Sequence, residues 1–198
     1  AILVETQESK AYLGLAGDEA CLDALADLTF APATFDRSRL VGIQTPGASA
    51  ALRLASDLAV RARPDSTVLV GTPTWSNHLP IFTAAGLAVR TYRYSKPAAA
   101  TVDYEAMFDA LAAAPSGTLV LLQGCCHNPT GIDLAVDDWI RIAGICCENG
   151  LLPLIDMAYN GLGEGFATDM LGVAEFLARV PEALMAVSCS KNFGLYRE

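Results

Sequence analysis

The sequence predicts an α/β fold built on a mainly parallel sheet. Short apolar runs bounded by turn residues recur along the chain, and segments with helical spacing lie between most of them. With 53% apolar and 18% charged residues, a chain of 198 residues has enough apolar side chains for a sizeable core. No linker or internal repeat divides it, so residues 1–198 are expected to form one domain.

Six apolar runs are expected to form buried strands. They are residues 40–45, 67–71, 87–92, 118–122, 151–155 and 184–188. Helices are expected at 50–63, 104–114 and 136–149. Gly150 follows the third helix and suits the left-handed residue that commonly ends one.

The composition argues against several classes of protein. Thirteen Lys and Arg against 22 Asp and Glu give a net charge of −9, so no nucleic-acid partner is expected. The long uncharged stretches 66–89 and 110–132 are interrupted by proline and glycine, so no membrane span is expected. Residues 1–10 lack the basic start and apolar core of an export signal, which favours a cytoplasmic location.

The six cysteines are interpreted as reduced, mostly buried thiols. No two of them are separated by the two residues typical of zinc ligands. Adjacent residues of a strand point to opposite faces, so Cys125 and Cys126 are not expected to share an ion with His127. No metal site is predicted.

Polar and aromatic residues follow four of the predicted strands, at the edge where open α/β sheets bind ligands. The segments are "TPTWSNH", "QGCCHNPTG", "DMAYNG" and "CSKNFG". They are expected to bring together Trp75, Asn77, His78, Asn128, Asp156, Tyr159, Ser188 and Lys191.

Each of these residues also has a purely structural interpretation. Lys191 follows a buried run, where desolvation favours the neutral amine of a Schiff-base nucleophile, but most lysines are surface charges. Asp156 ends an apolar run and is either a carboxylate with a buried partner or the N-cap of a helix. Trp75 could simply pack in the core, and "NPTG" could be only a turn.

The segments "QTPGASAAL", "TPTWSNH", "GCCHNPTG", "DMAYNG" and "SCSKNFGLYRE" carry a family resemblance. In this order and spacing they resemble the class I pyridoxal-phosphate aminotransferases of the aspartate and aromatic amino-acid subgroup. The resemblance begins near Tyr12 and implies the large domain of fold type I, a three-layer sandwich around a mainly parallel sheet. It implies a transaminase that transfers an amino group from an aspartate-type or aromatic amino acid to a 2-oxo acid through a pyridoxal 5'-phosphate Schiff base.

The same resemblance implies catalytic roles for three residues. Lys191 matches the lysine that bonds to the cofactor and moves a proton between the substrate Cα and the cofactor. Asp156 matches the carboxylate that keeps the pyridine nitrogen protonated. Tyr159 and Asn128 match donors to the phenolic oxygen of the cofactor, and Asn128 also matches a contact to the substrate carboxylate.

Further residues match parts of the cofactor and substrate site. Trp75 matches a ring stacked on the cofactor and next to the substrate. His78 matches an imidazole that orients Asp156; the alternative is a core histidine bonded to the backbone. Phosphate ligands are implied at Gly47, Ala48, Ser49 and Ser188, where "GASAAL" opens a helix. Tyr12 matches a residue that reaches the phosphate of a second subunit, which implies a homodimer.

The sequence departs from the family pattern at three positions. Ala48 and Ala50 replace common glycines, and an added methyl is harmless only at negative φ. Gln123 stands where the family often has histidine. The arginine that binds the substrate carboxylate, the smaller C-terminal domain and the N-terminal arm of the family are not expected among these residues, so a piece of a longer protein is expected.

Several alternatives stay open. The chain could be a non-catalytic pyridoxal-phosphate-binding or dimerisation fragment, or belong to a lyase on the same scaffold. Aspartate and aromatic substrates are both possible. A dinucleotide-dependent dehydrogenase is disfavoured because no strand is followed by G-x-G-x-x-G.

Overall fold

The computed structural model describes residues 11–30 and 36–195. Five parallel strands form its sheet: β1 (Thr67–Thr72), β2 (Ala88–Arg93), β5 (Leu119–Gln123), β6 (Leu152–Met157) and β7 (Leu184–Val187). The helices are α2 (Glu19–Phe30), α3 (Gly47–Ala62), α4 (His78–Ala84), α5 (Tyr104–Ala112), α6 (Val136–Asn149) and α7 (Phe166–Leu177). Short elements complete the chain: η1 (Arg37–Arg39), η2 (Pro97–Ala99) and the antiparallel pair β3 (Ser95–Lys96) and β4 (Thr101–Val102).

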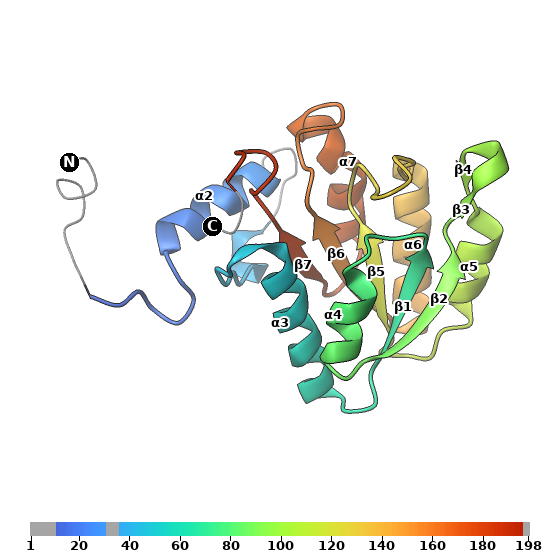
Figure 1. Ribbon diagram of the computed structural model, residues 1–198, viewed down its shortest axis with the longest axis horizontal. Helices are drawn as coiled ribbons and strands as arrows, with labels where there is room; N and C mark the ends of the chain where they lie inside the picture. The colour runs from blue at the N-terminus through green and yellow to red at the C-terminus, as the bar shows by residue number, and fades with distance from the viewer. Residues whose placement is uncertain (1–10, 31–35, 196–198) are drawn as a thin grey trace.

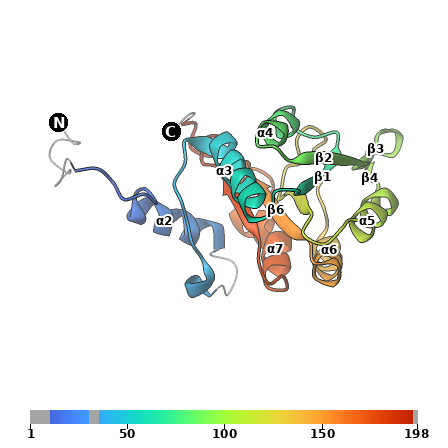
Figure 2. The same cartoon turned by 90° about the horizontal axis from the view of Figure 1, so that it is seen from below.

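Helices cover both faces of the sheet (Figures 1 and 2). On one side α3 and α4 pack against Val68 and Val70 of β1, and on the other α5, α6 and α7 enclose the core that contains Leu69. The division follows from the period of two along a strand, which sends successive side chains to opposite faces. The predicted α/β fold with a mainly parallel sheet is therefore confirmed.

Five of the six predicted strands are present, with ends shifted by a residue or two. The run 87–92 was expected to be buried, but β2 is an edge strand and only Tyr92 is fully buried in it. The prediction of a strand at 40–45 is wrong. Val41 is 89% exposed there, and Gln44 N–H donates to Ala16 O instead of to a neighbouring strand.

The three predicted helices are present as α3, α5 and α6, with α3 starting three residues earlier than expected. Gly150 ends α6 in the left-handed conformation at φ 59°, ψ 42°, as predicted. Helices α2, α4 and α7 were not predicted. Within the described ranges no helix is long and apolar enough to cross a membrane.

The strand order β2-β1-β5-β6-β7 reverses direction between β1 and β5. After β1 the chain moves outward to β2, and from β5 onward it moves to the opposite edge. Loops that leave neighbouring strands in opposite directions open a crevice at such a point, which is where open α/β sheets bind ligands. The polar segments that follow β1 and β5 both start there.

Candidate active site

One hollow lies at the carboxyl edge of the sheet and draws on several segments of the chain. It is lined by Ala48, Trp75, Gln123, Asn128, Asp156, Ala158, Tyr159 and Lys191. Five of the residues expected at this edge therefore meet in one place. Asn77 is exposed and does not line it, whereas His78 and Ser188 lie buried around it.

Asp156 supplies a buried carboxylate to the hollow. It lies inside β6, beside Gln123 of β5 and Ala186 of β7, and its side chain is 6% exposed. Its Oδ2 is 2.9 Å from His78 Nε2, while Oδ1 is buried with no hydrogen-bond partner in the described structure. The alternative of a helix N-cap is wrong, because Asp156 is a strand residue and the next helix starts at Phe166.

His78 orients that carboxylate from the first turn of α4. The imidazole is fully buried, and its Nδ1 lies 2.7 Å from Thr74 Oγ1 while Nε2 faces Asp156. Both partners are side chains, so the alternative of a core histidine bonded to the backbone is wrong. Trp75 meets the imidazole edge-on, with ring centroids 5.2 Å apart.

Three further polar side chains line the hollow together with Asp156, and they belong to Asn128, Tyr159 and Lys191. Asn128 Nδ2 donates to Tyr159 Oη at 3.3 Å. Lys191 Nζ lies 4.7 Å from the centre of the Tyr159 ring, within the range of a cation–π contact. Lys191 is half-buried and forms no ion pair with any described residue. An amine held this way can attack or exchange a proton at an electrophile that enters the hollow.

The start of α3 offers backbone donors next to the hollow. Gly47 has φ +78°, which suits glycine, and Pro46 before it makes no side-chain cap. The Gly47 N–H donates to Thr45 O at 2.8 Å, so the donors that the start of α3 can offer to an anion are the N–H groups that follow Gly47. Ala48 and Ala50 lie within α3 at negative φ, so their methyl groups fit, while Ser49 is exposed.

Two other residues predicted to bind phosphate differ in their setting. Ser188 follows β7, against which α3 packs, and its hydroxyl is buried beside Ser190. Tyr12 lies on the N-terminal segment (residues 11–18), which extends away from the sheet in Figure 1, and its side chain is fully exposed. Tyr12 does not line the hollow of its own chain.

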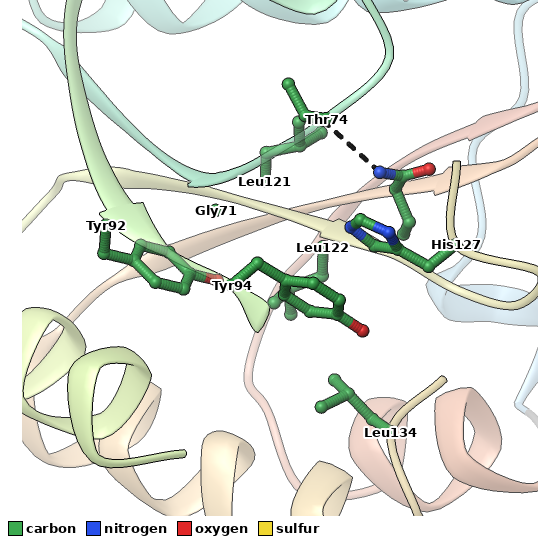
Figure 3. A pocket seen from close by; sticks show the side chains of 9 residues that line it. Gly71, Thr74, Tyr92, Tyr94, Leu121, Leu122, His127 and Leu134 are labelled. Carbon is green, nitrogen blue, oxygen red and sulfur yellow. Dashed lines mark hydrogen bonds between the residues drawn. The ribbon is translucent and has the colours of Figure 1, made fainter. Parts of the chain in front are cut away.

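Gln123, which lines the hollow, and Thr74 extend its hydrogen-bond network. Gln123 bonds to Thr74, and both line a second cavity of about 10 Å³ whose lining also includes Tyr92, Tyr94 and His127 (Figure 3). The sequence marks Gln123 only as a departure from the family pattern and gives no prediction for Thr74. A signal for Thr74 was present, because it precedes His78 by four residues within the same motif.

The expectation that Cys125 and Cys126 lie in a strand and point to opposite faces is wrong. Both follow the end of β5, Cys126 has φ +48°, and the two thiols approach Asp169 with all three ligand atoms within 4.8 Å of one another. Burial raises the pKa of both thiols. Both Asp169 oxygens accept backbone N–H groups of Gly161, Gly163 and Glu164, so this carboxylate is already engaged within the fold.

Comparison of the sequence with known proteins identifies a matching family and similar proteins. A sequence model of the family described as aminotransferase class I and II matches residues 2–198. The tyrosine aminotransferase of Rhizobium meliloti (strain 1021) is 50% identical over 196 residues, which are 99% of this chain and 50% of that protein. The aspartate aminotransferase of Salmonella typhi is 41% identical over 198 residues, 99% of this chain and 50% of the relative.

A solved structure shows the same fold. The aromatic-amino-acid aminotransferase of Burkholderia pseudomallei, covalently bound to pyridoxal phosphate, superposes with a TM-score of 0.91 at 31% identity. The match covers 98% of this chain and 49% of that chain. The chain thus spans about half the length of the relatives that it matches.

Proposed function

Because the chain belongs to the class I and II aminotransferase family, we propose that residues 1–198 are the cofactor-binding large domain of a pyridoxal-phosphate-dependent transaminase. In the full-length protein it would transfer an amino group from an amino acid to a 2-oxo acid. When bound, the cofactor supplies an aldehyde for the amino group and a ring that accepts electrons from the substrate Cα.

The single observation that carries this proposal is the unpartnered oxygen of Asp156. A buried carboxylate oxygen without a hydrogen bond is costly, so it needs a donor that the described chain does not provide. A protonated pyridine nitrogen is such a donor, and its positive charge offsets the buried negative charge. His78 holds the other oxygen and so fixes the direction in which Oδ1 is presented.

The remaining groups around the hollow fit the rest of the cofactor. Asn128 and Tyr159 present an amide and a phenol side by side, suited to a phenolic oxygen. The start of α3, with Gly47, Ala48 and Ser49, and the nearby Ser188 suit a phosphate.

Each residue then has a defined task. Lys191 would hold the aldehyde end of the cofactor through its amine and would carry the proton from the substrate Cα. Asp156 would keep the ring nitrogen protonated, with His78 holding that carboxylate in place. Trp75 would help to hold the cofactor ring, and Trp75 and Asn128 would contact the substrate.

The substrate and the assembly are part of the same proposal. A tyrosine and an aspartate aminotransferase are both relatives, so aromatic and aspartate-type amino acids are the proposed donors. The proposed assembly is a homodimer, because the N-terminal segment displays Tyr12, Leu13 and Leu15 to solvent and leaves Tyr12 available to reach a second subunit. A cytoplasmic location stays a prediction from the sequence.

Steady-state transamination tests the proposal. The full-length protein and the polypeptide of residues 1–198 are each assayed with tyrosine, phenylalanine or aspartate as donor and 2-oxoglutarate as acceptor. We expect activity from the full-length protein and none from the shorter polypeptide, because the residues that the structure describes place no arginine at the hollow for the substrate carboxylate. Elimination products without amino transfer would favour the lyase alternative, and an inactive full-length protein would refute the proposal.

A further inference from the structure

We propose that Gln123 is a positioning residue that sets the direction of a hydrogen-bond relay and thereby holds His78 as the neutral Nε2–H tautomer facing Asp156. The relay runs from the backbone of Asn128 through Gln123 and Thr74 to the imidazole. The inference rests on the proposed function for its purpose, because Asp156 is the residue that would meet the cofactor nitrogen.

The orientation of the Gln123 amide is fixed by the backbone. Asn128 N–H donates to Gln123 Oε1 at 2.9 Å, and Gln123 Nε2 donates to Asn128 O at 3.1 Å. A flipped amide would set two donors against each other and two acceptors against each other, which breaks both bonds. Nε2 is therefore the atom that faces Thr74 Oγ1, at 3.3 Å.

The fixed amide determines where the Thr74 proton goes. An amide nitrogen only donates, so Thr74 Oγ1 accepts from Gln123 and its own proton needs another acceptor. Among the described residues, the acceptor within reach is His78 Nδ1, at 2.7 Å. A nitrogen that accepts carries no proton, so the one proton of the neutral ring is on Nε2, which donates to Asp156 Oδ2 at 2.9 Å.

The relay has a consequence for the charge of the site. A neutral imidazole donates to Asp156 without bringing a positive charge of its own. The negative charge of the carboxylate is then left for a cation at its free Oδ1. An imidazolium at the same place would compete with that cation for the carboxylate's charge. Gln123 makes this difference because its side chain does not ionise and its two ends cannot exchange roles.

Neutron diffraction of perdeuterated crystals of the full-length protein, with and without pyridoxal phosphate, tests the proposal. We expect deuterium on His78 Nε2, none on Nδ1, and the Thr74 hydroxyl directed at Nδ1 in both forms. Deuterium on Nδ1 would overturn the inference. Because the proton positions are read in the cofactor-free form as well, failure to bind pyridoxal phosphate refutes the proposed function separately.

Reversal of the relay provides the second arm. In Gln123→Glu one carboxylate oxygen still accepts from Asn128 N–H, but the other now accepts from Thr74, so Thr74 must accept from His78 Nδ1. We expect deuterium on both imidazole nitrogens. The control Gln44→Glu adds the same charge on the segment before α3 and should leave Nδ1 bare. An unchanged His78 in folded Gln123→Glu, with no deuterium on the new carboxylate, would show that Gln123 does not set the direction. If that variant does not fold, the wild-type map decides.

Discussion

Replacement of Asp156 by asparagine isolates its charge from its shape. Asparagine has nearly the same size, and its side-chain oxygen can still accept from His78 Nε2, so the buried bond at 2.9 Å is kept. The free Oδ1 position loses its negative charge, and we expect the cofactor to bind and to react with Lys191. The electron-accepting power of the ring should fall, because its nitrogen no longer meets a carboxylate.

The size of the effect follows from the burial of Asp156. Two unit charges at about 3 Å in a site with an effective dielectric constant of about 20 attract by roughly 5 kcal/mol. At about 1.4 kcal/mol per factor of ten, the loss lowers the rate of Cα proton removal by roughly 10³ to 10⁴. The side chain is only 6% exposed, so little solvent screening reduces this figure.

Exchange of the substrate Cα proton in heavy water measures this step directly. The full-length Asp156→Asn protein should exchange the Cα proton of tyrosine or aspartate roughly 10³-fold more slowly than wild type, or slower still. Asp138→Asn serves as the control, because Asp138 accepts a hydrogen bond from Tyr104 on the helical layer and does not line the hollow. Wild-type exchange in Asp156→Asn would refute the role of the carboxylate.

Two predictions concern stability. Gly172→Ala would place a Cβ 2.2 Å from buried Trp139, and we expect urea titrations to show a free energy of unfolding lowered by about 1–3 kcal/mol. The control Gly144→Ala meets no atom within 4 Å and should raise the free energy of unfolding by up to about 1 kcal/mol. Equal effects of the two substitutions would contradict the packing of α6 against α7. Burial lowers the pKa of His127 to about 4, so as the pH falls below about 6.5 the unfolded chain binds a proton at His127 before the folded chain does. Between pH 7 and pH 5 the free energy of unfolding of wild type should therefore fall by about 2 kcal/mol more than that of His127→Gln. Parallel pH profiles of the two proteins would contradict this prediction.

The sequence predicts most of the fold because the sheet is buried. Strands such as β5 and β6 are covered on both faces, so they read as continuous apolar runs, and Gly150 marks the end of α6 by its backbone freedom alone. The same rule fails at 40–45, where Val41 and Ile43 are apolar but exposed. An apolar run shows that a strand could form and says nothing of whether a neighbour is there to pair with it.

The sequence predicts those site residues that follow the end of a predicted strand. Asp156 stands directly after the run 151–155 and Lys191 lies in the loop after the run 184–188, so the topology brings them to one edge. The relay through Thr74 and Gln123 was not predictable, because it depends on which side-chain atoms face each other across two strands. The closeness of Cys126 to Asp169 likewise follows from a left-handed backbone turn that the sequence does not specify.

Reduction with borohydride tests whether Lys191 is the residue that binds the cofactor, because it converts a Schiff base between a lysine and a bound aldehyde into a stable bond. The full-length protein is incubated with pyridoxal phosphate, reduced, digested and analysed by peptide mass spectrometry. We expect a single pyridoxyl adduct on Lys191, lost in Lys191→Ala and unaffected in Lys96→Ala. The Lys96 amine lies 3.3 Å from Asp103 Oδ1, and Lys96 does not line the hollow. An adduct on Lys96 in place of Lys191, or none at all in a folded full-length protein, would contradict it.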